Sequence, residues 1–195
     1  MQNVLSNKFA RQLCIKENIY LDMGLIIFGS IFVAVSSQIA FYLPFSPVPI
    51  TGQTFAVLLI GSVLGSRRGG LSLALYVLEG IIGLPVFAGG TGGLAVLFGP
   101  TAGYLIGFIP AAILVGHLSK KGFYRNWISM FFTLSLGLTV IYLFGVLRLL
   151  SFVDYKKVFI LGVNPFLVGD AIKIVMAMIL IPSDWKLLNK SKQIS

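Results

Sequence analysis

The chain has 195 residues, of which 57% are hydrophobic and only 11% are charged. Because a soluble domain of this length carries about 25% charged residues, the surplus apolar surface is expected to face lipid. The formal net charge of +9 would suggest a nucleic-acid partner in a soluble protein. Here the positions of the charges favour orientation in a lipid bilayer and argue against nucleic acid.

Five stretches of about 15 or more residues carry no formal charge, and a sixth is interrupted only by the pair Asp170 and Lys173. A spanning helix needs about 20 predominantly apolar residues, and no hydrophilic stretch is long enough for a second domain. We therefore expect an all-α membrane protein with a bundle of six transmembrane helices at residues 22–183, flanked by cytoplasmic tails at 1–21 and 184–195. The six stretches are 23–43, 44–66, 80–100, 98–116, 126–147 and the one that follows Asn164.

The distribution of Lys and Arg predicts how the spans are oriented. Six alternating spans place eleven of these residues on one side and three on the other, which is a strong positive-inside bias. Both termini are therefore expected in the cytoplasm, in a multi-pass membrane protein. The eleven are Lys8, Arg11, Lys16, Arg67, Arg68, Lys120, Lys121, Arg125, Lys186, Lys190 and Lys192, and the three are Arg148, Lys156 and Lys157.

The first span, about Met23 to Leu43, follows a basic tail. Its apolar run is longer than the roughly 7–15 residues of a signal peptide, so we expect a retained helix. Ser30 and Ala34 lie one turn apart on it, and such small residues let another helix approach closely. From the residues alone, packing inside this chain is favoured over docking onto a separate membrane subunit.

The next segment, PFSPVPITGQT at 44–54, holds three prolines and predicts an ordered outer loop that enters the second span near Ile50. Gln53 falls in the first turn of that span, where an interhelical hydrogen bond and a ligand contact are equally compatible with the sequence. The span is expected to end at GSRRGG, a short cytoplasmic turn at 65–70. The third span, about 70–83, contains Glu79.

The segment GLPVFAGGTGGLAVLFGPTAGY at 83–104 is rich in helix-breaking residues. Nine glycines lie between Gly80 and Gly107, together with Pro85 and Pro100. Non-helical backbone at membrane depth is tolerated only where it is buried in protein or lines a cavity. This segment therefore predicts part of a binding site.

The fourth span is expected to end near His117, and the fifth covers about 127–147. Residues 148–163 are mixed in character and predict a short amphipathic segment on the outer surface. Asn164 and Pro165 then read as the start of the last helix, since Asn is a good N-cap and Pro is favoured at the first helical position.

The last helix carries Asp170 and Lys173. Because they are three residues apart, they lie on the same face of the helix. An ionisable residue inside a membrane span usually faces the interior of the bundle and indicates a functional site. The alternative is a structural pair that satisfies only itself. A carboxylate accepts hydrogen bonds from N–H donors, and an ammonium pairs with an anion.

The aromatic residues available for the walls of such a site are Phe87, Phe98, Tyr104 and Phe166. The combination suits a small amphiphile with N–H groups at one end and an acid at the other. The residues alone do not name it.

Enzymatic functions find little support in the sequence. The single histidine, His117, cannot build a metal site or a catalytic triad alone. GTGGLA at 90–95 matches a dinucleotide-binding pattern, but no acidic residue follows about 20 residues later and the βαβ context is missing. The P-loop pattern is absent from the sequence, so no cofactor is expected in this chain, and any ATP would be used by partner subunits.

The ordered motifs PFSPVPITGQT, GLPVFAGGTGGL, GPTAGY and GDAIK resemble the BioY family over about residues 22–182. This is the family of biotin-binding S components of energy-coupling factor (ECF) vitamin transporters. The resemblance implies a six-helix bundle that binds biotin from outside and works with a transmembrane coupling subunit and ATPases. It is not an enzyme family.

The resemblance also assigns roles to residues. The D-x-x-K of the last helix, here Asp170 and Lys173, is expected to contact the ligand, and the glycine-rich loop at 89–93, with Gly90, Thr91 and Gly92, is expected to close the pocket. The stripe of Ser30 and Ala34 would dock on the coupling subunit. Glu79 departs from the family pattern, in which an apolar residue is usual.

For biotin, Asp170 would accept from the ureido N–H groups and Lys173 would pair with the valerate carboxylate, or the two would share these duties through Tyr104 or Gln53. Two other functions stay open from the sequence. The chain could be a self-sufficient facilitator or ion-coupled carrier with Asp170 as a proton site, or a membrane scaffold in which the pair is structural.

Overall fold

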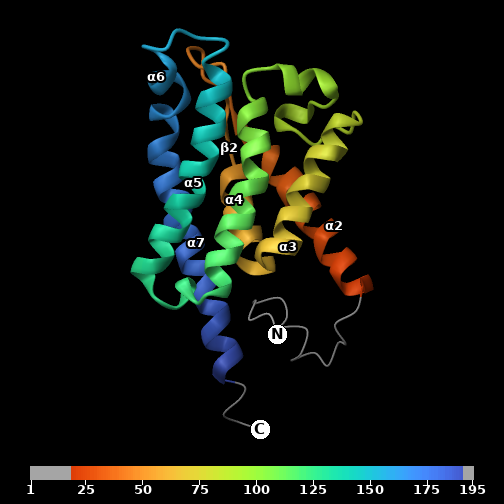
Figure 1. The fold of residues 1–195 in the computed structure, drawn as a ribbon, viewed down its shortest axis with the longest axis vertical. Helices are drawn as coiled ribbons and strands as arrows, with labels where there is room; N and C mark the ends of the chain where they lie inside the picture. Colours follow the sequence, from red (N-terminus) through yellow and green to blue (C-terminus); the bar gives the residue numbers. More distant parts are fainter. Residues whose placement is uncertain (1–18, 191–195) are drawn as a thin grey trace.

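The computed structural model describes residues 19–190, with the side chains of Arg125 and of residues 182–190 excepted. The chain forms a helical bundle, with a two-stranded antiparallel ribbon and two short 3₁₀ turns toward its upper end in Figure 1 and a third 3₁₀ turn, between α4 and α5, at its lower end. In chain order the elements are α2 (Ile19–Ser37), β1 (Ala40–Phe41), β2 (Ile50–Thr51), α3 (Gln53–Ile81), η1 (Ala88–Gly90), η2 (Leu94–Phe98), α4 (Ala102–Lys120), η3 (Phe123–Arg125), α5 (Trp127–Leu149), α6 (Val158–Gly162) and α7 (Asn164–Lys190).

Helix α3 is a hairpin of two arms, residues 53–64 and 66–81. The turn is at Gly65, whose φ of 79° and ψ of 179° are a conformation that glycine adopts at little cost. Gln53 Nε2 donates to the hydroxyl of Tyr76, and in a straight helix these residues would be about 35 Å apart. The turn therefore falls within the GSRRGG segment where the sequence predicts one.

Small residues let the neighbouring helices approach the turn of α3 closely. A Cβ placed on Gly116 of α4 would lie 2.3 Å from the backbone nitrogen of Ser66, and one on Gly61 would lie 2.8 Å from the carbonyl oxygen of Ala112. Helix α4 therefore packs against both arms of α3, while α2 and α7 also pack against α3. This arrangement brings the start of α3 beside the first turns of α7, where Thr54 bonds to Asp170.

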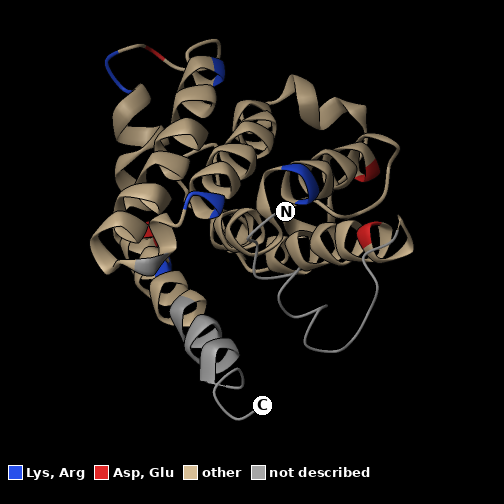
Figure 2. Ribbon diagram, turned by 60° about the horizontal axis from the view of Figure 1, so that its bottom comes forward, with Lys and Arg blue, Asp and Glu red and all other residues tan. Residues whose placement is uncertain are grey.

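Within the described residues, four helical stretches are long and apolar enough to cross a membrane: Ile19–Ser37, Ala102–Lys120, Trp127–Leu149 and Val158–Ile181. Large apolar side chains are exposed on their outer faces, such as Phe28 at 59%, Phe132 at 59% and Val168 at 73%. Figure 2 shows the charged residues as a few short segments on a ribbon that is otherwise uncharged. Such a surface is compatible with a lipid environment and not with water.

The structure corrects one predicted boundary. The first helix ends at Ser37 and not near Leu43, because the chain turns there into the ribbon in which Ala40 pairs with Thr51 and Phe41 with Ile50. Ile50 consequently lies in a strand, and α3 begins at Gln53.

The other boundaries lie close to the expected ones. The last helix begins at Asn164, and α6 falls inside the predicted surface segment. The predicted tail at 1–21 lies outside the described residues except for its last three, which belong to α2. At the other end, α7 continues to Lys190. The division into tails and a membrane domain stays a prediction.

Candidate functional site

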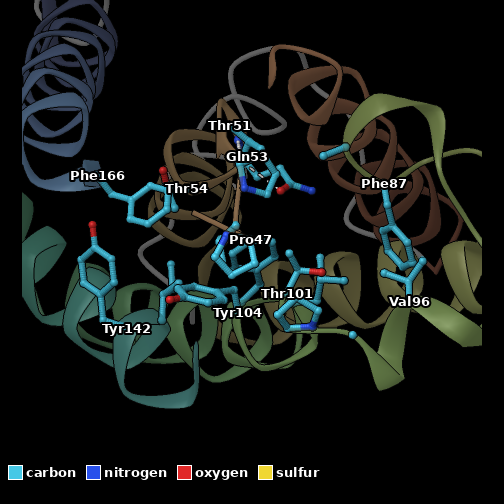
Figure 3. A pocket seen from close by; sticks show the side chains of 18 of the residues that line it. Pro47, Thr51, Gln53, Thr54, Phe87, Val96, Thr101, Tyr104, Tyr142 and Phe166 are labelled. Atoms are coloured by element: carbon cyan, nitrogen blue, oxygen red, sulfur yellow. Dashed lines mark hydrogen bonds between the residues drawn. The ribbon is translucent and has the colours of Figure 1, made fainter. Parts of the chain in front are cut away.

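A cavity of about 320 Å³ opens between the start of α3, the helices α4, α5 and α7, and the loops that join them (Figure 3). Its walls are mostly apolar and aromatic, and one acidic and one basic side chain reach it. The lining residues are Tyr42, Pro47, Val48, Pro49, Thr51, Gln53, Thr54, Phe87, Ala88, Thr91, Val96, Gly99, Pro100, Thr101, Tyr104, Leu105, Phe108, Ile141, Tyr142, Phe166, Asp170 and Lys173.

Asp170 is the centre of a polar cluster in this cavity, and only 2% of the residue is exposed. Its Oδ1 accepts from Lys173 Nζ at 2.8 Å and from Thr54 Oγ1 at 3.0 Å. Its Oδ2 accepts from the hydroxyl of Tyr142. Three helices, α3, α5 and α7, therefore meet at one carboxylate.

Thr54 closes the cluster, because its Oγ1 also accepts from Lys173 Nζ at 2.9 Å. A carboxylate has about four acceptor positions and an ammonium has three N–H donors. After the bonds just described, Asp170 Oδ2 retains one acceptor position and Lys173 retains one N–H. The cluster can therefore offer one acceptor and one donor, side by side, to a ligand.

Gln53 and Tyr104 line the same cavity but already bond within the protein. Gln53 Oε1 accepts from Thr51 Oγ1 at 3.0 Å, and its Nε2 donates to Tyr76 across the α3 hairpin. Tyr104 donates to the carbonyl oxygen of Gly162 at 2.8 Å. The interhelical bond predicted as one role of Gln53 is therefore present, and the residue is also placed to contact a ligand.

The glycine-rich loop contributes one of its three predicted residues to the lining. Thr91 lines the cavity, whereas Gly90 and Gly92 do not. Gly90, at a φ of +68°, donates its N–H to Gln38 Oε1 at 3.1 Å. A Cβ on Gly92 would lie 2.2 Å from the carbonyl oxygen of Leu84. Both glycines therefore shape the loop instead of forming the wall.

The aromatic wall is formed by three of the four predicted residues. Phe87, Tyr104 and Phe166 line the cavity. Phe98, the fourth aromatic residue available from the sequence, does not line the cavity; it lies at the end of η2 and is 67% exposed.

Sequence reasoning missed Thr54 and Tyr142, both of which bond to Asp170. The only signal for Tyr142 is a phenol in the middle of an otherwise apolar span. The sequence signal for Thr54 is equally weak: it is only the neighbour of Gln53 in the first turn of α3.

Ser30 lies inside the chain and not on its surface. It is fully buried, and its hydroxyl donates to Glu79 Oε2 in the second arm of α3. This contact gives Glu79 a partner that the sequence alone could not supply. Ala34 is half-buried and lines a second, more open groove together with Glu79 and Val86. The internal packing favoured by the residues therefore holds for Ser30.

No group of three or more metal-ligating side chains occurs among residues 19–190 where side chains are described. His117, near the end of α4, is exposed.

Comparison with known proteins gives a consistent result. A family model described as the BioY family matches residues 8–190. The probable biotin transporter BioY of Pyrococcus horikoshii is 44% identical over 154 residues, covering 77% of this chain and 90% of the relative. The biotin transporter BioY of Thermotoga maritima is 44% identical over 139 residues, covering 71% and 81%.

One solved structure also matches. It is described as the S-component for biotin from an ECF-type ABC transporter, and it superposes with a TM-score of 0.76 at 25% sequence identity. The match covers 88% of this chain and 95% of that one.

Proposed function

Because the chain belongs to the BioY family, we propose that it is the biotin-binding membrane subunit, or S component, of an ECF-type vitamin importer. It captures biotin from the outer side of the membrane. The relatives are named as transporters, which is a transport function and not catalysis. The observation that carries the proposal is the cavity with a buried Asp170–Lys173 cluster inside an apolar and aromatic wall.

Size and chemistry of the cavity both suit biotin. Ligand cavities in proteins usually have volumes of about 300–1,000 Å³ and mostly apolar walls with a few polar groups. This one has about 320 Å³. Biotin has an apolar bicyclic body, a ureido group at one end and a valerate carboxylate at the other, and therefore needs few polar contacts.

The geometry argues against dividing the two ends of biotin between Asp170 and Lys173. Asp170 Oδ1 and Lys173 Nζ are 2.8 Å apart, whereas the ureido group and the carboxylate are separated by the bicyclic ring and the valerate chain. An extended biotin cannot reach both residues with opposite ends. The cluster must therefore bind one end.

We assign the ureido end to this cluster. The Asp170–Lys173 pair is charge-balanced and offers one acceptor beside one donor, which matches an N–H next to a carbonyl. A ligand carboxylate at Lys173 would lie next to the Asp170 carboxylate, and like charges in a buried site repel. Lys173 is the only cation among the described residues that line the cavity.

The valerate chain then extends away from α7. In Figure 3, Phe166, Thr54 and Tyr142 lie on one side of the cavity, and Phe87 and Val96 lie on the opposite side. Thr91, on the same loop as Phe87, and Thr101, which Figure 3 shows between Tyr104 and Val96, also line the cavity. The Thr91 hydroxyl donates to the carbonyl oxygen of Ala88 at 3.0 Å, so we assign the carboxylate to the Thr101 hydroxyl.

Equilibrium dialysis of the purified protein with labelled biotin tests the proposal. We expect saturable binding at one site per chain, competed by unlabelled biotin and not by an unrelated vitamin such as thiamine. Absence of saturable binding in folded, detergent-stable protein would overturn the assignment of biotin.

We propose six membrane spans, with the arms of α3 counted as two beside α2, α4, α5 and α7, and with both termini in the cytoplasm of a bacterial cell membrane. Helix α2 begins and α7 ends at the same end of the bundle, the lower end in Figure 1, which supports an even number of spans. Accessibility of single introduced cysteines to an impermeant thiol reagent in intact cells tests this. Labelling at Lys121→Cys from outside would contradict it.

The import step is assigned to partner subunits, since the chain has no P-loop pattern for ATP. The alternative is a self-sufficient facilitator or ion-coupled carrier. Proteoliposomes separate the two. We expect uptake only with a coupling subunit, ATPases and ATP. Uptake by the chain alone would favour the facilitator, and uptake driven by a pH gradient would favour a carrier with Asp170 as the proton site.

Docking on the coupling subunit is assigned to the exposed side of α2 around Ala34. Since Ser30 is buried, Ser30→Leu would disturb packing within the chain, so Ala34→Leu is the informative variant. It should reduce ATP-driven uptake at least tenfold and leave biotin binding intact. Val168→Leu, on an exposed face of α7, is the matched control. Full uptake by Ala34→Leu would remove Ala34 from the docking surface.

A further inference from the structure

The loop at 86–91 separates the cavity from helix α2. Phe87, Ala88 and Thr91 of this loop form part of the cavity wall. On the other side, Val86 lines the second groove together with Gln38, the residue that follows the last turn of α2. The loop is therefore a thin wall with the cavity on one face and α2 on the other.

Two polar side chains at the end of α2 hold the backbone of this loop. Ser37 Oγ lies 2.6 Å from the carbonyl oxygens of both Val86 and Ala34, so its one O–H is shared between them. Gln38 Oε1 accepts from the N–H of Gly90 at 3.1 Å. Gln38 Nε2 lies 3.3 Å from the carbonyl oxygen of Phe87, and it is also within donating distance of Ser37 Oγ at 2.8 Å and of the Ala34 carbonyl oxygen at 3.2 Å. Gln38 thus bridges the two sides of the loop tip.

Hydrogen bonds within the loop shape its turn: the N–H of Gly90 also donates to the carbonyl oxygen of Phe87 at 3.1 Å, and Thr91 Oγ1 donates to the carbonyl oxygen of Ala88 at 3.0 Å. Gly89 and Gly90 both have a φ of +68°, and glycine populates many backbone conformations at similar energy. Inside the loop, the N–H of Phe87 donates to the carbonyl oxygen of Thr91 at 3.0 Å. This bond closes the turn but does not attach it to the bundle.

One contact on the cavity side attaches the loop to α3. A Cβ on Gly80 would lie 1.9 Å from the Phe87 ring, so that ring packs directly on the α3 backbone. The ring also makes an edge contact with Tyr76, with centroids 5.5 Å apart. The loop is therefore held by an apolar contact on its inner side and by Ser37 and Gln38 on its outer side. The chain just after the loop is bonded to α3, since the N–H of Gly93 donates to the carbonyl oxygen of Gly80 at 2.6 Å.

We propose that Gln38 is a positioning residue that fastens the loop at 86–91 over the cavity and sets the rate at which biotin leaves. The inference rests on the proposed function. Gln38 does not line the cavity, so it acts through the loop backbone and not by contact with the ligand. If biotin leaves past this loop, the loop must first detach from Gln38, which breaks both hydrogen bonds.

The test is the dissociation rate of biotin from the Gln38→Ala protein. A hydrogen bond typically contributes about 0.5–1.5 kcal/mol, so loss of two partly exposed bonds should raise the dissociation rate about tenfold. The association rate should stay the same or rise, because an unfastened loop also opens more often for entry. A variant that only destabilised the fold would lower the amount of binding protein without changing the dissociation rate.

Two further variants sharpen the test. Gln38→Glu keeps an oxygen for the N–H of Gly90 but loses the donor to Phe87, and its dissociation rate should lie between those of wild type and Gln38→Ala.

Ser36→Ala is the matched control, since in the described contacts the Ser36 hydroxyl bonds only to the carbonyl oxygen of Phe32 within α2. Its rate should equal that of wild type. Equal dissociation rates in Gln38→Ala and wild type would overturn the proposal.

Hydrogen–deuterium exchange of the 84–93 peptide provides a readout that does not need biotin. The Gln38→Ala protein should exchange faster in this peptide than wild type, and the Ser36→Ala protein should not. If wild type binds no biotin, the proposed function fails, and the exchange experiment still decides whether Gln38 fastens the loop. Unchanged exchange in Gln38→Ala would contradict the fastening role by itself.

Discussion

Two buried or partly buried ion pairs occur in the described part of the bundle, and they differ in what surrounds them. Asp170 and Lys173 lie on one helix and face a cavity. Asp22 of α2 pairs with Arg68 just after the turn of α3, with Arg68 Nε 2.7 Å from Asp22 Oδ1. Arg68 is buried, while 30% of the Asp22 side chain is exposed. Neither Asp22 nor Arg68 lines the cavity.

An ion pair inside a membrane bundle is therefore not by itself a binding site. The Asp22–Arg68 pair joins α2 to α3, and Asp22 in the first turn of α2 also interacts favourably with the helix dipole. The Asp170–Lys173 pair joins residues that its own helix already holds together. Asp170 also accepts hydrogen bonds from Thr54 and Tyr142, and the pair retains one acceptor position and one N–H donor that can bond to a ligand in the cavity.

Asp170→Asn should produce the largest loss of biotin affinity. A hydrogen bond to a charged group contributes about 1.5–3 kcal/mol, so its loss should weaken binding by about 10- to 150-fold. Titration of the purified variant with labelled biotin measures this, with a thermal melt to show that the protein is folded. Wild-type affinity in the variant would make the pair structural, like Asp22–Arg68.

Tyr142→Phe should have a smaller effect of the same kind. The phenol donates to Asp170 Oδ2, the oxygen with acceptor capacity left for the ligand, and so orients it. Loss of about 1 kcal/mol predicts roughly fivefold weaker binding. Tyr155→Phe, at a residue that is 70% exposed, is the control. An unchanged affinity in Tyr142→Phe would mean that Tyr142 does not orient the carboxylate.

If Asp170 and Lys173 bind the ureido end, the affinity for the amide of biotin should be within about threefold of the affinity for biotin. The sequence alone suggested the opposite, because it left Lys173 available for the carboxylate. In the structure Lys173 donates to both Asp170 and Thr54. Competition of the amide against labelled biotin decides between the two. A loss of a hundredfold or more would place the carboxylate at Lys173.

Asp22→Asn should leave biotin affinity within about twofold of wild type, the smallest effect on binding. Because it weakens the joint between α2 and α3, the same variant should lower the thermal midpoint of the detergent-solubilised protein. Loss of affinity comparable to that of Asp170→Asn, with the midpoint unchanged, would mean that the two pairs do not differ in the way described here.

Sequence reasoning found the site through the residues that are costly in a membrane. Asp170 and Lys173 stand out because burying an ionisable group in a membrane span costs free energy, so such groups usually have a functional role. The glycine-rich segment stands out because its glycines and prolines interrupt the helix. Thr54 and Tyr142 were missed because one hydroxyl in an apolar helix carries little cost and can bond to its own backbone.

Other details of the candidate site depend on tertiary structure. Whether Gly90 and Gly92 form the wall or shape the loop depends on which way the backbone turns at each glycine, and local sequence does not determine that. The same holds for Phe98, which faces outward. The bundle was predictable from apolar stretches and turn residues, whereas the contact between Ser30 and Glu79 depends on how α2 packs on α3, which no local pattern encodes.

The most direct test is an experimental structure of the protein with biotin bound. We expect the ureido N–H within about 3 Å of Asp170 Oδ2, a normal hydrogen-bond distance, with the valerate chain directed toward the loop at 86–91. Biotin with its carboxylate on Lys173, or biotin outside this cavity, would contradict this expectation.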